Sequence, residues 1–247
     1  MMQVCKMGNI KVTVSSSGDI QQTVTEAVRQ RKKERYYFVN AHCFNISQRD
    51  ETYRHCLNEA EYVLNDGIGM EIGSKLFGIR FMENLNGTDL MPRLLGHFAD
   101  CDISVFLLGG QQGVAEAAAS SLKKRYPNLR VAGYLHGYYS DQNWVVEQIN
   151  RASPDVVIVA MGVPIQEKWI DRHFDRIDAR AFFAVGAYLD FESDRIKRAP
   201  RWMRLLRFEW LFRLWLEPRR MWKRYLIGNG LFLYHVLKLR LLKNRGS

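Results

Sequence analysis

The sequence predicts a Rossmann-like α/β fold with an open, mainly parallel sheet, helices on both faces and a basic helical C-terminal appendage. Strand-like apolar runs alternate with segments of helical periodicity from Tyr36 onward, and this alternation favours parallel pairing. With 47% hydrophobic residues, the 247-residue chain can bury a substantial core. The last fifth of the chain differs from the rest in charge, which indicates an appendage to one globular domain.

The first half alternates helix-like and strand-like patterns. Residues 19–32 are polar and helix-like, and the β-branched and aromatic run that begins near Tyr36 indicates a buried strand. Asp50 can cap a second helix, whose apolar residues recur at helical spacing up to a turn at residues 65–67. A short helix follows that turn, and the polar cluster at residues 86–89 can cap the next one.

The second half is more regular. ISVFLLGG is an apolar run that ends in glycine, and VAEAAASSLKKRY has strong helix propensity, which predicts a strand, a loop and a helix. The series continues with LRVAGYLHGYY, a strand that leads into a loop, and then with helix NWVVEQINRA, buried strand DVVIVAMG, the start of a helix in QEKWIDRHF and the closing segment ARAFFAVGAYLDF. Ligands of such sheets bind beyond the carboxyl ends of the strands.

Charge divides the chain into two parts. Residues 195–245 hold fifteen Lys and Arg against two acids, and also four of the six tryptophans. We therefore expect a catalytic domain over residues 1–194 and a helical appendage over 195–247 that contacts an anionic membrane surface. The N-terminus lacks a signal-peptide pattern, and no apolar run reaches the ~18 residues of a membrane-spanning helix. These features predict a peripheral protein on the cytoplasmic face of the inner membrane.

Cysteine and histidine spacings give no sign of a structural metal. The four cysteines are scattered without paired spacing, and the six histidines form neither HExxH nor HxH. We therefore expect reduced thiols and no structural zinc.

Two glycine-containing loops can bind a nucleotide. Gly109, Gly110 and Gly113 lie between a strand and a helix N-terminus, where backbone N–H groups favour a phosphate. A plain tight turn is the alternative, because the full GxGxxG pattern is missing. The second loop follows the most apolar strand, and its Gln side chain could hydrogen-bond a uracil or ribose edge, unless it and the neighbouring Glu are merely solvated. That loop contributes Gly162, Pro164, Gln166 and Glu167.

A carboxylate in the first half is the candidate base. Asp66 lies in the Asn-Asp-Gly turn beside the predicted sheet edge, where it could accept the proton of an attacking hydroxyl. Such turns are also common without any catalytic role.

Five blocks along the chain form a more specific pattern. They are NDGIGMEIGSKLFG, NGTDLMPRLL, VFLLGGQQGVAEAA, PDVVIVAMGVPIQEKWI, and a last block from AVGAYLDFESDRIKRAPRWM to EPRRMWKRY. Together they resemble the WecG/TagA/CpsF glycosyltransferases, glycosyltransferase family 26. The resemblance covers about Tyr36 to Tyr225, nearly the whole predicted fold.

The resemblance implies a UDP-sugar donor and an undecaprenyl-diphosphate-linked sugar acceptor. It gives Asp66 the role of catalytic base, places Gln166 and Asn40 at the donor, and places Thr88 at the acceptor. It also implies that cations of the appendage close over the site and bind diphosphate. These cations are Arg213, Arg219, Arg220, Lys223 and Arg224.

Two departures from the family pattern bear on the donor sugar. Phe38 replaces a threonine that often precedes the equivalent of Asn40 by two residues, and Asn84 replaces the arginine of the ERxxGTDL pattern. The donor can therefore be UDP-glucose, as in exopolysaccharide assembly, instead of the UDP-N-acetylmannosamine of teichoic-acid enzymes. A common-antigen-like pathway is a third alternative.

The residues and the resemblance together predict an inverting displacement. Asp66 removes the proton of the acceptor hydroxyl, and UDP leaves from the opposite face of the sugar. No suitable DxD motif is evident, so we expect neither a metal nor another cofactor, with helix N–H groups and appendage arginines stabilising the leaving diphosphate.

Two other classes of protein share parts of this pattern. A nucleic-acid-binding protein also uses basic, aromatic segments, although the apolar face of the appendage fits lipid better and we expect no nucleic-acid partner. A non-catalytic membrane scaffold could retain the same fold. An exposed apolar appendage could also be covered by self-association into a homo-oligomer.

Overall fold

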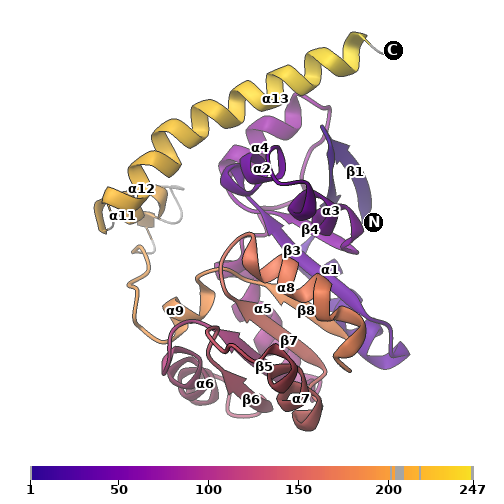
Figure 1. Cartoon of the computed structure of the whole chain (residues 1–247), viewed down its shortest axis with the longest axis vertical. Coiled ribbons are helices and arrows are strands. Elements are labelled where there is room, and N and C mark those ends of the chain that lie inside the picture. The colour runs from indigo at the N-terminus through magenta and orange to yellow at the C-terminus, as the bar shows by residue number, and fades with distance from the viewer. Residues whose placement is uncertain (1, 201, 204–208, 217, 246–247) are drawn as a thin grey trace.

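A six-stranded parallel sheet forms the centre of the computed structural model, which describes residues 2–200, 202–203, 209–216 and 218–245. The strand order is β4-β3-β8-β7-β5-β6, and Figure 1 shows helices on both faces. This arrangement confirms the predicted Rossmann-like α/β fold. The strands are β3 (Glu34–Val39), β4 (Tyr62–Asn65), β5 (Val105–Gly109), β6 (Val131–Leu135), β7 (Val156–Ala160) and β8 (Ala181–Ala184).

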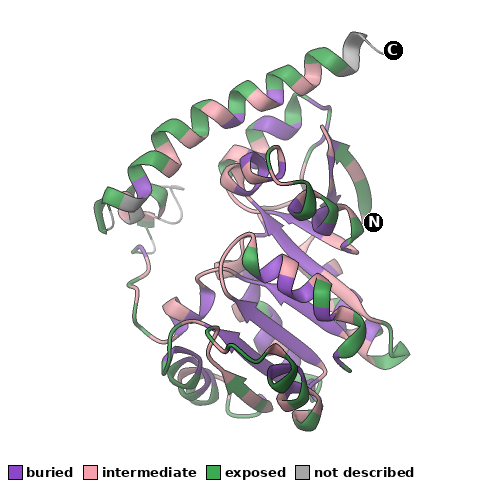
Figure 2. Ribbon diagram, in the orientation of Figure 1, coloured by how far each residue is buried: buried purple, intermediate pink, exposed green. Residues whose placement is uncertain are grey.

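Successive residues of every strand except β6 enter two separate cores, one on each face of the sheet, whereas the residues of β6 are half-buried or exposed. In β3, Tyr37 and Val39 belong to one apolar cluster, whereas Tyr36 and Phe38 belong to the other. The alternation follows from the two-residue period of a strand, and burial on both faces explains the continuous apolar runs. Figure 2 shows these strands buried throughout much of their length.

Helices cover the two faces in two groups. Helices α2 (Ala41–Ser47), α3 (Glu51–Glu59), α7 (Gln142–Ala152) and α8 (Ile165–His173) contribute buried side chains to the first cluster. Helices α1 (Ser17–Gln30), α5 (Gly87–Asp100), α6 (Val114–Arg125) and α9 (Tyr188–Glu192) contribute to the second. Helix α4 (Ile68–Lys75) follows β4, and the short 3₁₀ helix η1 (Phe174–Arg176) follows α8.

The predicted continuous helix before the turn at residues 65–67 is wrong in its second part. Helix α3 ends at Glu59, and the next residues form strand β4, which pairs with β3 at the sheet edge. Val63 and Leu64 are both buried but enter opposite cores, as neighbouring residues of a strand must. Their spacing from the apolar residues of α3 happened to match a helical period as well.

An N-terminal hairpin adds to the predicted elements. Strands β1 (Gln3–Met7) and β2 (Ile10–Val14) pair antiparallel around a turn at Gly8, whose φ is 64°. The hairpin packs beside β4, where the backbone N–H of Val63 donates to Thr13 Oγ1 at 3.1 Å. The edge strand is thereby covered, which is how sheets limit edge-to-edge association.

The C-terminal appendage is helical, as its pattern predicts. It comprises α11 (Glu209–Leu216), α12 (Pro218–Trp222), the π-helical segment η2 (Lys223–Ile227) and α13 (Gly228–Arg245). Within the described parts of the chain, no helix combines the length and apolarity that crossing a bilayer requires. Whether residues 1–194 and 195–247 are separate domains stays a prediction.

Helix α13 packs back on the first half of the fold (Figure 1). Phe232 and Val236 are buried, and the Phe232 ring contacts Phe44 of α2 edge-to-face at a centroid distance of 5.3 Å. Asn45 Nδ2 donates to the Gly228 carbonyl at 2.7 Å. A Cβ at Gly73 of α4 would lie 2.6 Å from the Phe232 ring, so glycine permits this close approach.

We expect Phe232→Ala to lower the free energy of unfolding by about 3–5 kcal/mol, because it removes a buried ring that joins α13 to α2 and α4. Urea unfolding followed by tryptophan fluorescence measures this change. The matched control is Tyr234→Ala, since Tyr234 lies on the same helix and is 58% exposed. Equal effects of the two substitutions would show that α13 is not docked as described.

Candidate active site

The carboxyl edge of the sheet brings together most of the predicted site residues. Parallel strands all end at this edge, so the residues that follow β3, β4, β5, β7 and β8 converge. They are Asn40, Asp66, the loop 109–113, the loop 161–164 and Gly186.

Asp66 is half-buried and held from two sides. Its backbone N–H donates to the Val39 carbonyl at 2.9 Å, and Asn40 Nδ2 donates to its carboxylate oxygen Oδ2 at 3.1 Å. Asn40 Oδ1 meanwhile caps α2 by accepting the N–H groups of His42 and Cys43, both at 3.1 Å. Because the helix cap fixes the amide of Asn40, its Nδ2 is directed at Asp66. The carboxylate therefore has a defined place at the edge of the sheet.

The segment before α5 fixes the turn that carries Asp66. Gly67 has a φ of 87°, and its N–H donates to Asn84 Oδ1 at 2.8 Å. Asn65 Nδ2 donates to the Glu83 carbonyl at 3.0 Å, and the Leu85 N–H returns a bond to the Asn65 carbonyl at 3.1 Å. Asn84, where the family pattern has an arginine, thus accepts a hydrogen bond that supports the turn.

The glycine loop after β5 requires its glycines. A Cβ at Gly109 would lie 2.2 Å from the Ala160 carbonyl oxygen of β7, and Gly110 and Gly113 have φ values of 70° and 86°. Gly113 precedes α6, and no described side chain caps that helix. The Val114 N–H donates to the Gln111 carbonyl at 3.0 Å, so the N–H groups of Ala115 and Glu116 are the ones in this first turn that an anion can use.

Gln166 and Glu167 are buried, so the alternative that they are merely solvated is wrong. Gln166 is 1% exposed, and its Oε1 accepts the N–H groups of Gly162 at 3.2 Å and Gly186 at 2.9 Å. Its Nε2 donates to Glu167 Oε1 at 2.9 Å. The pair thereby ties the loop after β7 to the loop after β8. A direct contact of either side chain with a donor stays a prediction.

Burial raises the pKa of Glu167 to about 8, because the fully buried carboxyl is separated from water. The bond from Gln166 opposes this shift only in part, and Glu167 Oε2 has no hydrogen-bond partner among the described residues. Glu167 is therefore a neutral acid at pH 7 that positions Gln166.

Two further predicted residues lie at the rim. Pro164 follows a cis peptide bond and precedes α8. Thr88 Oγ1 donates to Asn86 Oδ1 at 2.8 Å, and the Thr88 carbonyl accepts Arg198 Nη1 at 2.9 Å. Arg198 also pairs with Asp89, so the first residues of the appendage are attached to the start of α5.

Of the five predicted cations, Arg224 is the one whose charge acts on described residues beside Asp66. Burial, together with the nearby Arg224 guanidinium, lowers the pKa of His42 to about 4. Burial raises the pKa of the Cys43 thiol to about 12, and among the smaller influences Arg224 lowers it while Asp66 raises it. Arg224 and Asp66 thus both act on the first turn of α2.

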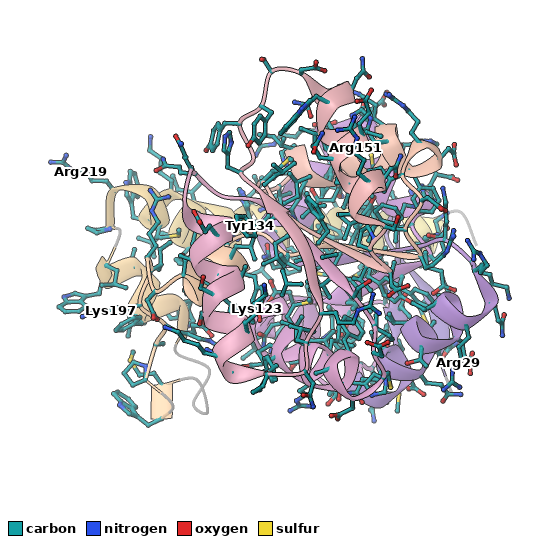
Figure 3. The ribbon with its side chains drawn as sticks, turned by 90° about the horizontal axis from the view of Figure 1, so that it is seen from below. Arg29, Lys123, Tyr134, Arg151, Lys197 and Arg219 are labelled. Atoms are coloured by element: carbon teal, nitrogen blue, oxygen red, sulfur yellow. The ribbon has the colours of Figure 1, made fainter. Side chains whose placement is uncertain are left out.

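The other four cations are placed less closely or lie outside the description. Lys223 is exposed, with its Nζ 5.7 Å from the centroid of the Trp222 ring. Arg219 is exposed on α12 and points outward in Figure 3. Arg213 and Arg220 lie in α11 and α12, but their side chains lie outside the described part of the structure. Diphosphate binding by these four residues stays a prediction.

Comparison with known proteins decides the family. The model of the glycosyl transferase WecG/TagA/CpsF family matches residues 5–246, almost the whole chain. The chain belongs to the WecG/TagA/CpsF glycosyltransferase family. This assignment confirms the resemblance of the five blocks and favours glycosyl transfer over the nucleic-acid-binding and scaffold alternatives.

Relatives in this family are similar over most of both chains. An N-acetylglucosaminyldiphosphoundecaprenol N-acetyl-β-D-mannosaminyltransferase of Bacillus subtilis (strain 168) is 38% identical over 178 residues, which are 72% of this chain and 69% of the relative. A transferase of the same name from Staphylococcus aureus (strain MRSA252) is 32% identical over 204 residues, 81% of this chain and 78% of the relative. One from Bacillus spizizenii is 33% identical over 174 residues, covering 70% and 67%.

The structure adds site residues to this WecG/TagA/CpsF chain that the sequence did not single out. His42 and Gly186 join the edge through the contacts above. The loop after β6 also reaches it, because the Gly137 N–H donates to the Gly110 carbonyl at 2.9 Å. In that loop the His136 and Tyr139 rings stack at 3.9 Å between centroids. In the sequence, the only sign of this loop was the run HGYY, an aromatic cluster at the end of a predicted strand.

Among the residues that the structure describes, no group of three or more His, Cys, Asp or Glu side chains could hold a metal ion.

We expect Glu167→Gln to remove a pH dependence of stability. The unfolded chain ionises Glu167 near its ordinary pKa of 4.5, whereas the folded chain keeps the proton up to about pH 8. The native chain therefore loses stability as pH rises from 4.5 to 8, by about 1.4 kcal/mol for each unit of pKa difference. Glutamine can still accept the bond from Gln166 but does not ionise.

Urea unfolding of the native chain and of Glu167→Gln at pH 5 and pH 8 measures this difference. From pH 5 to pH 8, we expect the free energy of unfolding of Glu167→Gln to rise by a few kcal/mol relative to that of the native chain. Parallel pH dependence of the two proteins would show that Glu167 is not held as a neutral acid.

Proposed function

We propose that the protein transfers a sugar from a UDP-sugar to a polyprenyl-diphosphate-linked sugar acceptor, with inversion at the anomeric carbon. The observation that carries the proposal is the Asp66 carboxylate, which Asn40 holds at the carboxyl edge of the sheet. The uncapped start of α6 lies at the same edge, and Arg224 acts on the neighbouring turn of α2. A base, an anion-binding helix terminus and a cation are the groups that such a transfer needs.

Charge favours this edge as the nucleotide site over the cleft beside α1. That cleft has a volume of about 270 Å³, and the charged residues that line it are Asp19, Glu26, Glu34 and Lys32, three acids against one cation. Carboxylates there would repel a diphosphate, whereas the carboxyl edge offers backbone N–H groups and Arg224. The glycine loop after β5 and the loop that Gln166 secures are therefore the proposed donor cradle.

The reaction balances with the groups at this edge. Asp66 takes the proton of the acceptor hydroxyl, whose oxygen forms a bond to the anomeric carbon of the donor sugar. The bond from that carbon to the β-phosphate oxygen breaks, and UDP leaves with the electron pair. The N–H groups of α6 and the guanidinium of Arg224 stabilise the charge that develops on the diphosphate.

The relatives indicate the class of acceptor and one donor. They are named as N-acetylmannosaminyl transferases that act on N-acetylglucosaminyldiphosphoundecaprenol. We propose the same class of lipid-linked acceptor here, in cell-surface polysaccharide assembly at the cytoplasmic face of the membrane. N-acetylmannosamine and glucose are both candidate sugars. Asn84 supports the Gly67 turn, and Phe38 is 6% exposed in the core, so neither provides a charged contact to the donor.

We expect Asp66→Asn to lower the transfer rate at least about 100-fold, because the amide cannot accept the acceptor proton. A radiolabelled UDP-sugar and a lipid-diphosphate sugar acceptor measure the rate, and product mass identifies the sugar. Asp102→Asn is the matched control, since Asp102 lies before β5 at the amino edge with a side chain that is 78% exposed. Near-native transfer by a folded Asp66→Asn protein would exclude Asp66 as the base.

We expect the transfer rate to be unchanged by a chelator, because helix N–H groups and appendage cations supply the positive charge for the leaving diphosphate. The measurement compares rates with and without EDTA after the protein has been dialysed against it. A loss of rate that Mg²⁺ or Mn²⁺ restores would contradict the metal-free proposal.

A further inference from the structure

Helix α4 exposes an aliphatic stripe next to the candidate active site. Ile68 is 45% exposed, Ile72 50% and Leu76, which ends the helix, 38%. Residues four apart lie on one face of a helix, so the three side chains form one row. The opposite side of the helix is packed, since Met70 and Ser74 are buried. The exposure is therefore a property of one face and not of a poorly packed helix.

Positive charge flanks this stripe. Lys75 and Arg80 are exposed on either side of Leu76 in the sequence, and Met82 extends the apolar surface with 56% exposure. Glu71 is half-buried on the same helix. Aliphatic side chains that are bordered by exposed Lys and Arg are typical of surfaces that lie in the headgroup region of an anionic bilayer.

An apolar cleft begins where the stripe ends. Phe77 follows Leu76 and lines a cleft of about 370 Å³ together with Gly8 of the hairpin turn and Leu239 of α13. Lys6 and Asn9 complete the lining. Its apolar walls and the neighbouring Lys6 suit an acyl chain with an anionic headgroup.

Helix α13 continues the same kind of surface. It lies against α4 through Phe232 and Gly73, and it exposes Leu237, Lys238 and Leu241. Figures 1 and 2 show α4 and the largely exposed α13 at the same end of the molecule. A surface that includes α4 would therefore have the appendage as its neighbour.

We propose that the exposed face of α4 is a membrane-docking surface for an anionic lipid bilayer, distinct from the appendage. Ile68, Ile72 and Leu76 enter the headgroup region, while Lys75 and Arg80 lie near lipid phosphates. Because Gly67 precedes the helix and Asp66 precedes Gly67, docking brings the candidate base to the membrane surface. In this respect the inference rests on the proposed function, whose acceptor is lipid-linked.

A bilayer fits the stripe better than a second copy of the chain. The eight residues of α4 extend for only about 12 Å, and a stable dimer buries about 800 Å² on each partner. A two-fold contact through this face would also gather Lys75 and Arg80 of both copies around one interface. An anionic surface instead complements both charges.

The test measures binding of the full chain to vesicles of phosphatidylethanolamine and phosphatidylglycerol by co-sedimentation. We expect Ile72→Glu and Leu76→Glu each to weaken binding roughly tenfold, because each loses apolar burial and adds a charge of the wrong sign. Val4→Glu is the matched control, since Val4 is 60% exposed on β1. Vesicles of phosphatidylcholine alone should bind the native chain more weakly.

Activity separates docking from chemistry. Ile72→Glu should transfer sugar at the native rate to a short-chain, water-soluble acceptor and more slowly to a polyprenyl acceptor in vesicles. Native vesicle binding by both folded α4 variants would overturn the inference, as would variants that change only the oligomeric state in analytical ultracentrifugation. If the native chain transferred no sugar to either acceptor, the proposed function would fail, and vesicle binding would still decide the role of α4.

Discussion

The amide of Asn40 joins the end of β3, the start of α2 and the carboxylate of Asp66. Its oxygen is used by the helix cap and its nitrogen by the carboxylate, so one orientation of the amide serves both. The arrangement depends on parallel pairing of β3 with β4, which places Asn40 and Asp66 at the same edge. A sheet with β4 in another position would separate the Asp66 carboxylate from Asn40 and the start of α2.

Buried polar groups hold the rest of this edge together. Gln166 joins the loops after β7 and β8 by accepting a backbone N–H group from each, and it donates a hydrogen bond to Glu167. Such groups are costly to bury unless they are hydrogen-bonded or neutral. Gln166 is bonded at both ends of its amide, and Glu167, whose Oε2 has no partner among the described residues, is buried with its proton. The glycine-rich loops therefore keep the backbone exposed to a ligand without being free to move independently.

The appendage carries both apolar and basic side chains, and its contacts with the rest of the fold follow from these two kinds. Phe232 and Val236 pack α13 against the first half of the fold, while the charge of Arg224 lowers the pKa of His42 at the start of α2. One segment thus contributes both packing and charge to the first half of the fold. Relatives in the WecG/TagA/CpsF family are named for a diphosphate-linked acceptor, and a diphosphate is opposite in charge to the cations of the appendage.

The sequence predicted the parts of the fold that depend on local pattern. The apolar runs at β5 and β7 were unambiguous because both faces of these strands are buried, and Asp50 caps α3 as predicted, through the N–H of Tyr53. Strand β4 was missed because a four-residue edge strand is too short for its period to outweigh the helix before it. The Asn-Asp-Gly turn made Asp66 a candidate base, and the resemblance implied that role, which stays a prediction.

Long-range partners were beyond the local pattern. The burial of Gln166 depends on Gly186, twenty residues away, and the effect of Arg224 on His42 depends on how α13 docks. Neither relation leaves a periodicity or a spacing in the sequence. The sequence could therefore name these residues or their types, but it could not say which of them lie together.

The most direct measurement of the central claim is an NMR titration of the isotopically labelled protein with UDP. If the carboxyl edge beside Asp66 is the donor site, the amide signals of Gly110, Gly113, Gly162 and Gly186 shift on binding, and those of the cleft beside α1 do not. Shifts confined to Asp19, Glu26 and Glu34, which line that cleft, would contradict the account.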